Sequence, residues 1–298
     1  MGTVRYTECP VCKSSKIQPL LTVIDQTVSG ETFEVWMCQA CTLRFTQGAP
    51  DESSIAPYYK SEAYISHTDS NKGVINQLYK WVRRYTLGLK AKLLVTHTGK
   101  PKGTLLDIGC GTGAFLNRMQ QNGWVARGLE PNSEARDLAS KLYGIEAGDI
   151  TELFKLQPAS FDAVTMWHVL EHVHQVHDYV EQISKLLKAG GRLFIAVPNY
   201  ESLDADIYGS YWAAYDVPRH LYHFTPKAIS AIVSQHGMSV TAKEPMWFDA
   251  FYISMLSSKY QTGSIAYAGS LLNGLRSNLL ALREPSRCSS VIYVVSKS

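Results

Sequence analysis

The sequence has no long apolar run and little net charge. No segment reaches the roughly 18 unbroken apolar residues of a membrane span, and we expect none. Residues 1–6 contain no apolar stretch that could serve as a signal peptide, which predicts a cytoplasmic protein with reduced thiols. The net charge of +3 is spread without blocks of like charge, so it gives no clear sign of a nucleic-acid partner.

Apolar residues are abundant, and three zones can be distinguished. With 45% apolar and 18% charged residues in 298, the chain can bury a full core, as a globular protein does. Residues 1–57 hold four of the six cysteines and resemble short strands with turns. Residues 58–100 predict a helical lid or linker, and residues 101–298 predict the main domain.

The main domain alternates short apolar strands with helices. Strands are expected at 104–108, 124–129, 145–147, 161–167, 192–197, 238–244 and 290–295, with a helical pair over 249–282 before the last. Such alternation predicts an α/β fold with a doubly wound, mostly parallel sheet. The preceding zone predicts one long helix, whose apolar face is formed by Val74, Leu78, Trp81, Val82, Tyr85, Leu89 and Leu93.

A glycine loop follows the first strand of this domain. Asp107 lies at the end of this strand, and the loop then carries Gly109, Gly111 and Gly113 before a helix. Glycines permit positive φ and a close approach of backbone to a ligand, and the helix start offers free N–H groups. The spacing is G-x-G-x-G, whereas a dinucleotide fold requires G-x-G-x-x-G. A carboxylate at Asp107 would repel a pyrophosphate but suits a cationic ligand.

Two further carboxylate side chains lie at the ends of the second and third expected strands. Glu130 lies about 20 residues after the loop, where a carboxylate can accept both hydroxyls of a ribose. This feature suits a dinucleotide fold equally well. Asp149 ends the third strand and is placed to reach an adenine amino group.

The segment Asp107–Gly113, together with Glu130, Asp149 and residues 161–172, resembles the motifs of the class I S-adenosylmethionine-dependent methyltransferases. The resemblance covers about residues 104–197. It implies a Rossmann-like sheet of seven strands whose last strand is antiparallel, with S-adenosylmethionine as cofactor. It also implies that Trp167 and His168, after the fourth strand, line the methyl-transfer pocket.

The cysteines of the first zone form two C-x-x-C pairs, Cys9 with Cys12 and Cys38 with Cys41. Four thiolates on two tight turns satisfy tetrahedral zinc and leave no open position, which predicts a structural zinc in a zinc-ribbon-like module. A redox dithiol and two unrelated core pairs are the alternatives. This module ahead of a methyltransferase core is distantly similar to the sugar C-methyltransferases, although the chain ends before their further C-terminal domain could fit.

Histidines supply candidate bases. His168 to His172 match H-x-x-E-H, which also occurs in zinc peptidases, but here an apolar strand ends at Trp167 and a peptidase helix is not expected. A loop after the fifth strand holds Tyr215, Arg219, His220 and His223, where substrates bind in this architecture.

The resemblance to the sugar C-methyltransferases matches His220 to their catalytic base, with Arg219 in place of their glutamate. We expect His220 as first and His172 as second candidate base, because a histidine titrates near neutral pH. Arg219, Tyr215 and His223 are expected to contact the acceptor, and the arginine hints at an anionic one.

The sequence thus predicts a methyltransferase that modifies a small molecule by O- or C-methylation, with a sugar or an anionic metabolite as the possible acceptor class. One alternative is methylation of RNA or protein gripped by the zinc module. Another is a cofactor-binding scaffold without catalysis, against which the intact glycine loop argues. Nothing in the residues indicates the oligomeric state.

Overall fold

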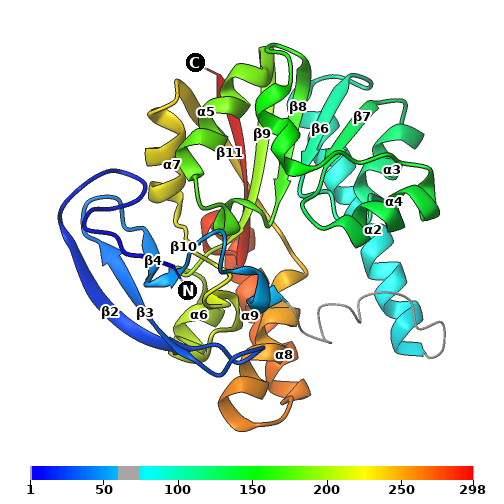
Figure 1. Ribbon diagram of the computed structural model, residues 1–298. Coiled ribbons are helices and arrows are strands. Elements are labelled where there is room, and N and C mark those ends of the chain that lie inside the picture. Colours follow the sequence, from blue (N-terminus) through cyan, green and yellow to red (C-terminus); the bar gives the residue numbers. More distant parts are fainter. Residues whose placement is uncertain (1, 60–73, 298) are drawn as a thin grey trace.

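The computed structural model describes residues 2–59 and 74–297, and from residue 82 onward the side chains of the long helix as well. Its centre is a six-stranded sheet (Figure 1). In spatial order its strands are β11 (Met238–Pro245), β12 (Ser290–Lys297), β9 (Leu187–Pro198), β8 (Phe161–Trp167), β6 (Thr104–Ile108) and β7 (Val125–Leu129).

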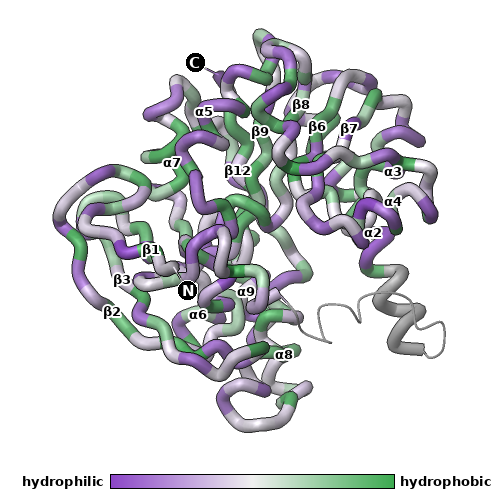
Figure 2. The backbone as a smooth tube through the Cα atoms, viewed as in Figure 1, coloured by the Kyte–Doolittle hydropathy of each residue, from purple (hydrophilic) through white to green (hydrophobic). Residues whose placement is uncertain are grey.

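The sheet is parallel except for one strand. β6 pairs in parallel with β7 and β8, and β8 pairs in parallel with β9, whereas β12 runs antiparallel to both β9 and β11. The doubly wound α/β fold and the antiparallel last strand are therefore confirmed. Strands covered on both faces are apolar throughout, and Figure 2 shows hydrophobic residues along β9 and β12 in the middle of the sheet.

The expected seventh strand is reduced to a single bridge. Residues 145–147 form no strand, and only Gly148 pairs with Leu129, in parallel. The chain turns away at once because Asp149 caps the 3-10 helix η2 (Ile150–Lys155). The side chain of Glu146 meanwhile accepts a hydrogen bond from Ser140, at the surface.

Helices cover both faces of the sheet. On one face α2 (Val74–Thr98) and α3 (Ala114–Gln121) pack on Leu105 and Val294. On the other, α5 (Val176–Leu186) and α7 (Pro226–Ser234) pack on Leu106 and Val295. Successive residues of one strand thus pack into the cores on opposite faces of the sheet, because side chains alternate between the two faces along a strand. α4 (Ser133–Tyr143) is capped by Asn132, whose side chain accepts a hydrogen bond from the Ala135 N–H at 3.0 Å.

Between β9 and β12 the chain adds helices at the carboxyl end of the sheet. These are α6 (Leu203–Tyr208), the 3-10 turns η4 (Gly209–Tyr211) and η5 (Ala213–Tyr215), and the expected helical pair α8 (Asp249–Thr262) and α9 (Tyr267–Arg283), followed by η6 (Pro285–Arg287). A further turn, η3 (Leu170–His172), follows β8. Within the described ranges, no helix is both long and apolar enough to cross a membrane.

The N-terminal zone forms a second sheet that the main domain completes. Its strands β2 (Ile17–Ile24), β3 (Thr32–Cys38) and β4 (Arg44–Gln47) are joined by β10 (Tyr222–His223), which pairs with β4. β1 (Thr3–Val4) pairs with β5 (Ala49–Pro50), and η1 (Ala56–Tyr59) ends the zone. Since β10 comes from the long connection after β9, the N-terminal zone and that connection share one sheet.

Candidate active site

The glycine loop joins β6 to α3 in left-handed backbone. Gly109, Gly111 and Gly113 have φ of 69°, 54° and 76°. A Cβ at Gly109 would lie 2.4 Å from Cγ2 of Val169, so this glycine is needed for packing. A Cβ at Gly111 would meet nothing within 4 Å, so the loop is open to a ligand there. The loop is held by the Gly109 and Cys110 N–H groups, which both donate to the Leu129 carbonyl.

Asp107 lies buried at the end of β6. Its Oδ1 accepts a hydrogen bond from Thr165 Oγ1 at 2.6 Å. Burial raises the pKa of this carboxyl to about 7, although the Thr165 hydrogen bond and the nearby charge of Lys90 oppose the rise. A cationic ligand beside this buried carboxyl group would favour its ionised form, because the two opposite charges attract.

Glu130 is fixed at the end of β7 by two backbone donors. Its Oε2 accepts from Gly111 N–H at 2.9 Å and its Oε1 from Asn132 N–H at 3.0 Å. Each oxygen keeps a second lone pair, so the carboxylate can still accept two further hydrogen bonds. The carboxylate is thereby tied to the glycine loop itself.

Asp149, which was predicted to contact adenine, also caps the 3-10 helix η2. Its Oδ1 accepts from the N–H and hydroxyl of Thr151, in the first turn of η2, and its Oδ2 lies 3.1 Å from Arg136 Nη1. These hydrogen bonds, those to Thr151 first, lower the pKa of the carboxyl. The expected contact of Asp149 with adenine stays a prediction.

Trp167 ends β8 beside the loop, with Phe115 of α3 standing edge-on at 5.3 Å between ring centroids. Nζ of Lys90, from α2, lies over the tryptophan ring at 4.4 Å from the centroid. Burial lowers the pKa of Lys90, while the charges of Asp249 and Asp107 act against that change. Lys90 is not among the residues that the sequence predicted for the site.

His168 is held between two carboxylates. Its backbone has a φ of 57°, its Nε2 lies 3.0 Å from Oδ2 of Asp249, and its Nδ1 lies 3.3 Å from Oε1 of Glu171. Burial would lower the pKa of His168, but these two carboxylates outweigh it and raise the pKa to about 9. His168 is therefore an imidazolium at neutral pH that joins β8 to the start of α8.

The two predicted bases lie against each other. The rings of His172 and His220 meet edge to face with centroids 4.6 Å apart. Nδ1 of His172 lies 3.0 Å from the Arg219 carbonyl and 3.1 Å from the Tyr59 hydroxyl, and Nδ1 of His220 lies 2.8 Å from the Ala214 carbonyl. A carbonyl can only accept, so each Nδ1 carries the proton and each Nε2 is left as the basic nitrogen.

Glu171 completes this cluster. It is fully buried, and within the described part of the chain its Oε2 has no hydrogen-bond partner. Glu171, His172 and His220 each have one nitrogen or oxygen atom of the metal-ligating kind in this cluster, and these atoms lie within 4.8 Å of one another. Burial and the neighbouring His220 lower the pKa of His172 to about 4, so its ring stays neutral. The cluster can therefore receive a hydroxyl or another hydrogen-bond donor.

Arg219 is committed to protein partners. Its Nη2 lies 2.6 Å from Oδ1 of Asp216 and 3.0 Å from Oδ1 of Asp25, its Nε donates to Asp216, and its Nη1 donates to the Tyr58 carbonyl. Only 4% of its surface is exposed. The guanidinium thus holds the loop after β9 against the N-terminal zone, which differs from the expected contact with an anionic acceptor.

Tyr215 and His223 also lie at the contact between the loop and the N-terminal sheet. Tyr215 accepts a hydrogen bond from Arg44 at 2.5 Å, and Nε2 of His223 lies 3.4 Å from the Thr46 hydroxyl. Both side chains are buried. The structure therefore brings them close to His220 but not to the large cavity described next.

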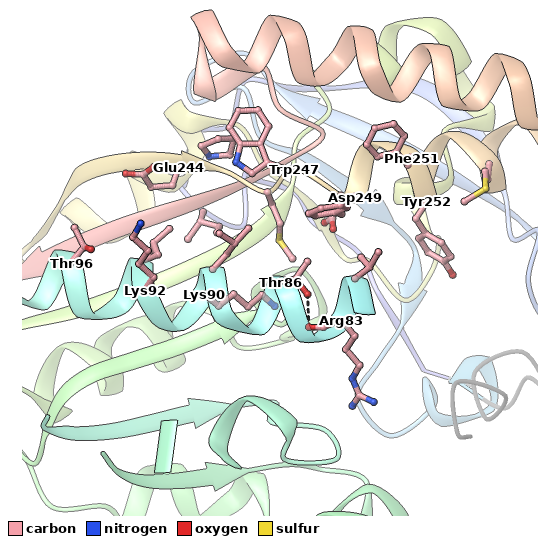
Figure 3. Close-up of a pocket in the computed structure, with 18 of the residues that line it drawn as sticks. Arg83, Thr86, Lys90, Lys92, Thr96, Glu244, Trp247, Asp249, Phe251 and Tyr252 are labelled. Atoms are coloured by element: carbon pink, nitrogen blue, oxygen red, sulfur yellow. Dashed lines mark hydrogen bonds between the residues drawn. The ribbon is translucent and has the colours of Figure 1, made fainter. Parts of the chain in front are cut away.

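A cavity of about 1000 Å³ lies between α2 and the start of α8 and α9 (Figure 3). Its walls are mostly apolar and rich in aromatic rings, among them Trp247, Phe248, Phe251 and Tyr252. Lys90 and Asp249 are polar groups in the wall, and Asp249 is the partner of His168. The cavity thus adjoins the residues after β8, and its size suits a small molecule.

The four cysteines of the N-terminal zone converge. Sγ atoms of Cys9 and Cys41 lie 3.5 Å apart, as do those of Cys12 and Cys38, and all four lie within 4.8 Å of one another. Tetrahedral Zn–S bonds of about 2.3 Å would place the sulfurs about 3.8 Å apart. Hydrogen bonds from Cys41 first, and then from backbone N–H groups, lower the pKa of Cys9. The donor set and spacing fit a zinc ion.

A mostly parallel α/β sheet with a G-x-G-x-G loop and buried carboxylates at its carboxyl end is the arrangement of the class I S-adenosylmethionine-dependent methyltransferases. Residues 80–243 match the methyltransferase domain family, and the chain belongs to it. The family match begins within the long helix and includes none of the four clustered cysteines.

Named relatives agree with this class. The chain is 26% identical to a ubiquinone biosynthesis O-methyltransferase of Xanthomonas euvesicatoria over 179 residues, which are 55% of this chain and 74% of the relative. It is 34% identical over 103 residues to the enzyme of the same name from Idiomarina loihiensis, covering 32% and 42%. A geranyl diphosphate C-methyltransferase from Streptomyces coelicolor superposes with a TM-score of 0.51 at 16% identity, covering 78% of this chain and 88% of that one, and shows the fold.

Proposed function

We propose that S-adenosylmethionine binds at the glycine loop and that this chain transfers its methyl group to a hydroxyl of a small apolar acceptor. The observation that carries the proposal is the open left-handed loop at Gly111, flanked by the buried Asp107 and by Glu130. In this proposal Gly109, Gly111 and Gly113 allow the close approach and Glu130 accepts the ribose hydroxyls. Asp107 balances the cationic methionyl end, and Asp149, Trp167 and His168 border the site.

Lys90 is proposed as a further cofactor contact. The methionyl end of the cofactor carries a carboxylate as well as an ammonium group, and Lys90 supplies a half-buried cation beside Trp167. A cation and a carboxylate in a partly dry site attract more strongly than at the surface. Asp107 and Lys90 would then hold the two ends of one zwitterion.

The acceptor is proposed to place its apolar body in the aromatic cavity and its hydroxyl at the histidine pair. The bound cofactor supplies an already activated methyl group, so the protein needs only to align and deprotonate the acceptor. The Nε2 of His220 takes the proton, and Asp216, whose Oδ2 lies 3.9 Å away, stabilises the imidazolium that forms. His172 orients the same hydroxyl. O-methylation is also the reaction named for the relatives.

The remaining residues that the sequence predicted as substrate contacts are proposed to act indirectly, by holding the loop and the histidines in place. Arg219 holds the loop by its ion pairs, and its backbone carbonyl orients His172. Tyr215 and His223 support the same loop against β4. These three are therefore positioning residues in the proposal, and the expectation of an anionic acceptor loses its main support.

A structural zinc ion held by Cys9, Cys12, Cys38 and Cys41 is proposed for the N-terminal module, residues 1–57. A purified chain should contain one zinc, Cys38→Ser should lose it, and Cys288→Ser should keep it, because that buried cysteine lies outside the cluster. Retention of zinc by Cys38→Ser would contradict the assignment.

Methylation of RNA or protein is supported less well. One cysteine turn faces the main domain: the Pro10 carbonyl lies 3.1 Å from Nε2 of His177, and Gln235 donates to the Val11 carbonyl. This side of the module is covered and is not available to grip a macromolecule.

The proposed reaction can be tested with methyl-labelled S-adenosylmethionine and a series of phenols with alkyl tails of increasing length. Label should enter the phenol, and KM should fall as the tail lengthens, because apolar surface enters the cavity. Transfer that is insensitive to the tail would exclude the cavity, and no transfer to any member would argue against an apolar hydroxyl acceptor.

A further inference from the structure

α9 carries its large apolar side chains on the outside. Five leucines of this helix are between 48% and 68% exposed: Leu271, Leu272, Leu275, Leu279 and Leu282. At about 100° per residue they fall within an arc of about 100°, so they form one continuous stripe. We call these five residues the leucine stripe. Monomeric proteins rarely leave so many neighbouring leucines in water, and such patches mark interaction sites.

The inner face of α9 fixes this orientation. Its buried positions are small residues, Ser270, Gly274, Ser277 and Ala281. A Cβ at Gly274 would lie 2.4 Å from Cδ1 of Phe251 in α8, so the two helices are in close contact there. Ser270 donates to the Ser254 carbonyl at 3.1 Å, and Ser277 donates to Asp204 at 3.2 Å. The helix cannot turn its leucines inward without losing these contacts.

The charged side chains of α9 itself all have one sign. Arg276 and Arg283 lie beside it on the helix surface, and both are exposed. α9 contains no aspartate or glutamate from Tyr267 to Arg283. Tyr267, 69% exposed, stands at the start of the helix. Leucines flanked by arginines and an aromatic residue are typical of a helix that lies in the interface of an anionic bilayer, where arginine heads reach the lipid phosphates.

The stripe is continuous with the aromatic cavity. Tyr267 and Leu271 line the cavity as well as the exposed face of α9. Figure 1 shows α8 and α9 as a hairpin at the end of the molecule remote from α5, and Figure 3 shows α9 running above the cavity. A bilayer against α9 would therefore lie next to the opening through which an apolar acceptor enters.

We propose that α9 docks on an anionic lipid bilayer through the leucine stripe, with Arg276 and Arg283 on lipid phosphates, and that the acceptor enters the cavity from the lipid. Only the second half rests on the proposed function. A second copy of the chain is the less favoured occupant, because α9 packed on α9 would gather four arginines with no carboxylate on either helix.

The test is co-sedimentation of the full chain with phosphatidylcholine vesicles, with and without phosphatidylglycerol. The chain should sediment with the anionic vesicles, and Leu275→Ser/Leu279→Ser should weaken binding about tenfold or more. Val125→Ser is the matched control, since Val125 is 74% exposed on the edge strand β7 and should bind as the parent does. Arg276→Gln/Arg283→Gln should lose the preference for anionic vesicles.

Binding that the leucine variant leaves unchanged, or no sedimentation of the parent with either vesicle, would overturn the proposal. A dimer that dissociates in the leucine variant, without vesicle binding, would assign the stripe to a second copy instead. Calorimetric binding of S-adenosylmethionine should be the same for the parent and the leucine variant. This readout separates failure of the docking proposal from failure of the proposed function.

Discussion

His172 and His220 lie edge to face with ring centroids 4.6 Å apart, and one ring nitrogen of each lies within 4.8 Å of a carboxylate oxygen of the buried Glu171. Burying hydrogen-bond acceptors of Glu171, His172 and His220 together without a donor between them would lower the stability of the fold. A hydroxyl that arrives with a proton to give resolves this imbalance. The arrangement therefore suits a proton-accepting step better than simple packing does.

His220→Gln should lower kcat by about 10²- to 10⁴-fold, the usual contribution of a general base, and leave the KM for the cofactor unchanged. His172→Gln should have a smaller effect, because burial lowers its pKa to about 4 and makes it a weak base. Steady-state kinetics with both substrates varied would measure this. An equal loss in the two variants would contradict the assignment of His220 as base.

Lys90→Met should weaken S-adenosylmethionine binding by about tenfold to a hundredfold, because a charge-assisted contact to the carboxylate contributes about 1.5–3 kcal/mol. Lys90→Arg should restore most of the affinity. Decarboxylated S-adenosylmethionine is the matched ligand, since it lacks the group that Lys90 is proposed to hold. Calorimetry should show that Lys90→Met leaves the affinity for this ligand unchanged; an equal loss for both ligands would exclude the carboxylate contact.

Gly109 and Gly111 should respond differently to alanine. Both have positive φ, which costs an alanine about 1–2 kcal/mol, but only at Gly109 does the new Cβ also meet Val169. Gly109→Ala should therefore lower the free energy of unfolding more than Gly111→Ala does. Gly111→Ala should fold and yet bind the cofactor poorly, because its Cβ enters the open side of the loop. Denaturant unfolding and calorimetry on both variants would reveal a reversed order.

His168 should make stability fall on the alkaline side. Its folded pKa of about 9 lies above the ordinary value of 6.5, so its ion pairs stabilise the fold fully below about pH 6.5 and are lost as the pH rises toward 9. In His168→Asn, the loss of unfolding free energy between about pH 6.5 and 9 should be smaller than in the parent by on the order of 1–3 kcal/mol. Urea unfolding of parent and variant at both ends of the range would measure the difference, and parallel pH profiles would contradict the ion-pair account.

The sheet and the glycine loop could be predicted because their signals are local. Alternating apolar strands and helices fix the winding, and glycines before a helix define the loop. The seventh strand could not be predicted correctly, since whether residues 145–147 pair depends on how Asp149 caps the next turn. Parts of the apolar face expected on the long helix, Val74, Leu78 and Trp81, lie outside the described side chains.

The arrangement of the candidate site could not be predicted from local patterns, because its side chains come from distant segments. His172 and His220 were both named, but their contact follows only from folding. In the sequence, Arg219 resembles a residue free to bind an anion. In the structure its guanidinium pairs with Asp25, which lies 194 residues earlier in the chain. Lys90 resembles a surface lysine in the sequence, and its proposed role rests on its position over the Trp167 ring. Local patterns do not contain such pairings.

The central claim is that the glycine loop and its carboxylates bind the cofactor, and calorimetric titration with S-adenosylhomocysteine tests it most directly. We expect one site per chain with about micromolar affinity, and Glu130→Ala and Asp107→Asn should each weaken binding by about tenfold or more, since each removes charged hydrogen bonds in a dry site. No heat of binding with the parent chain, or the same affinity in both variants, would contradict the account.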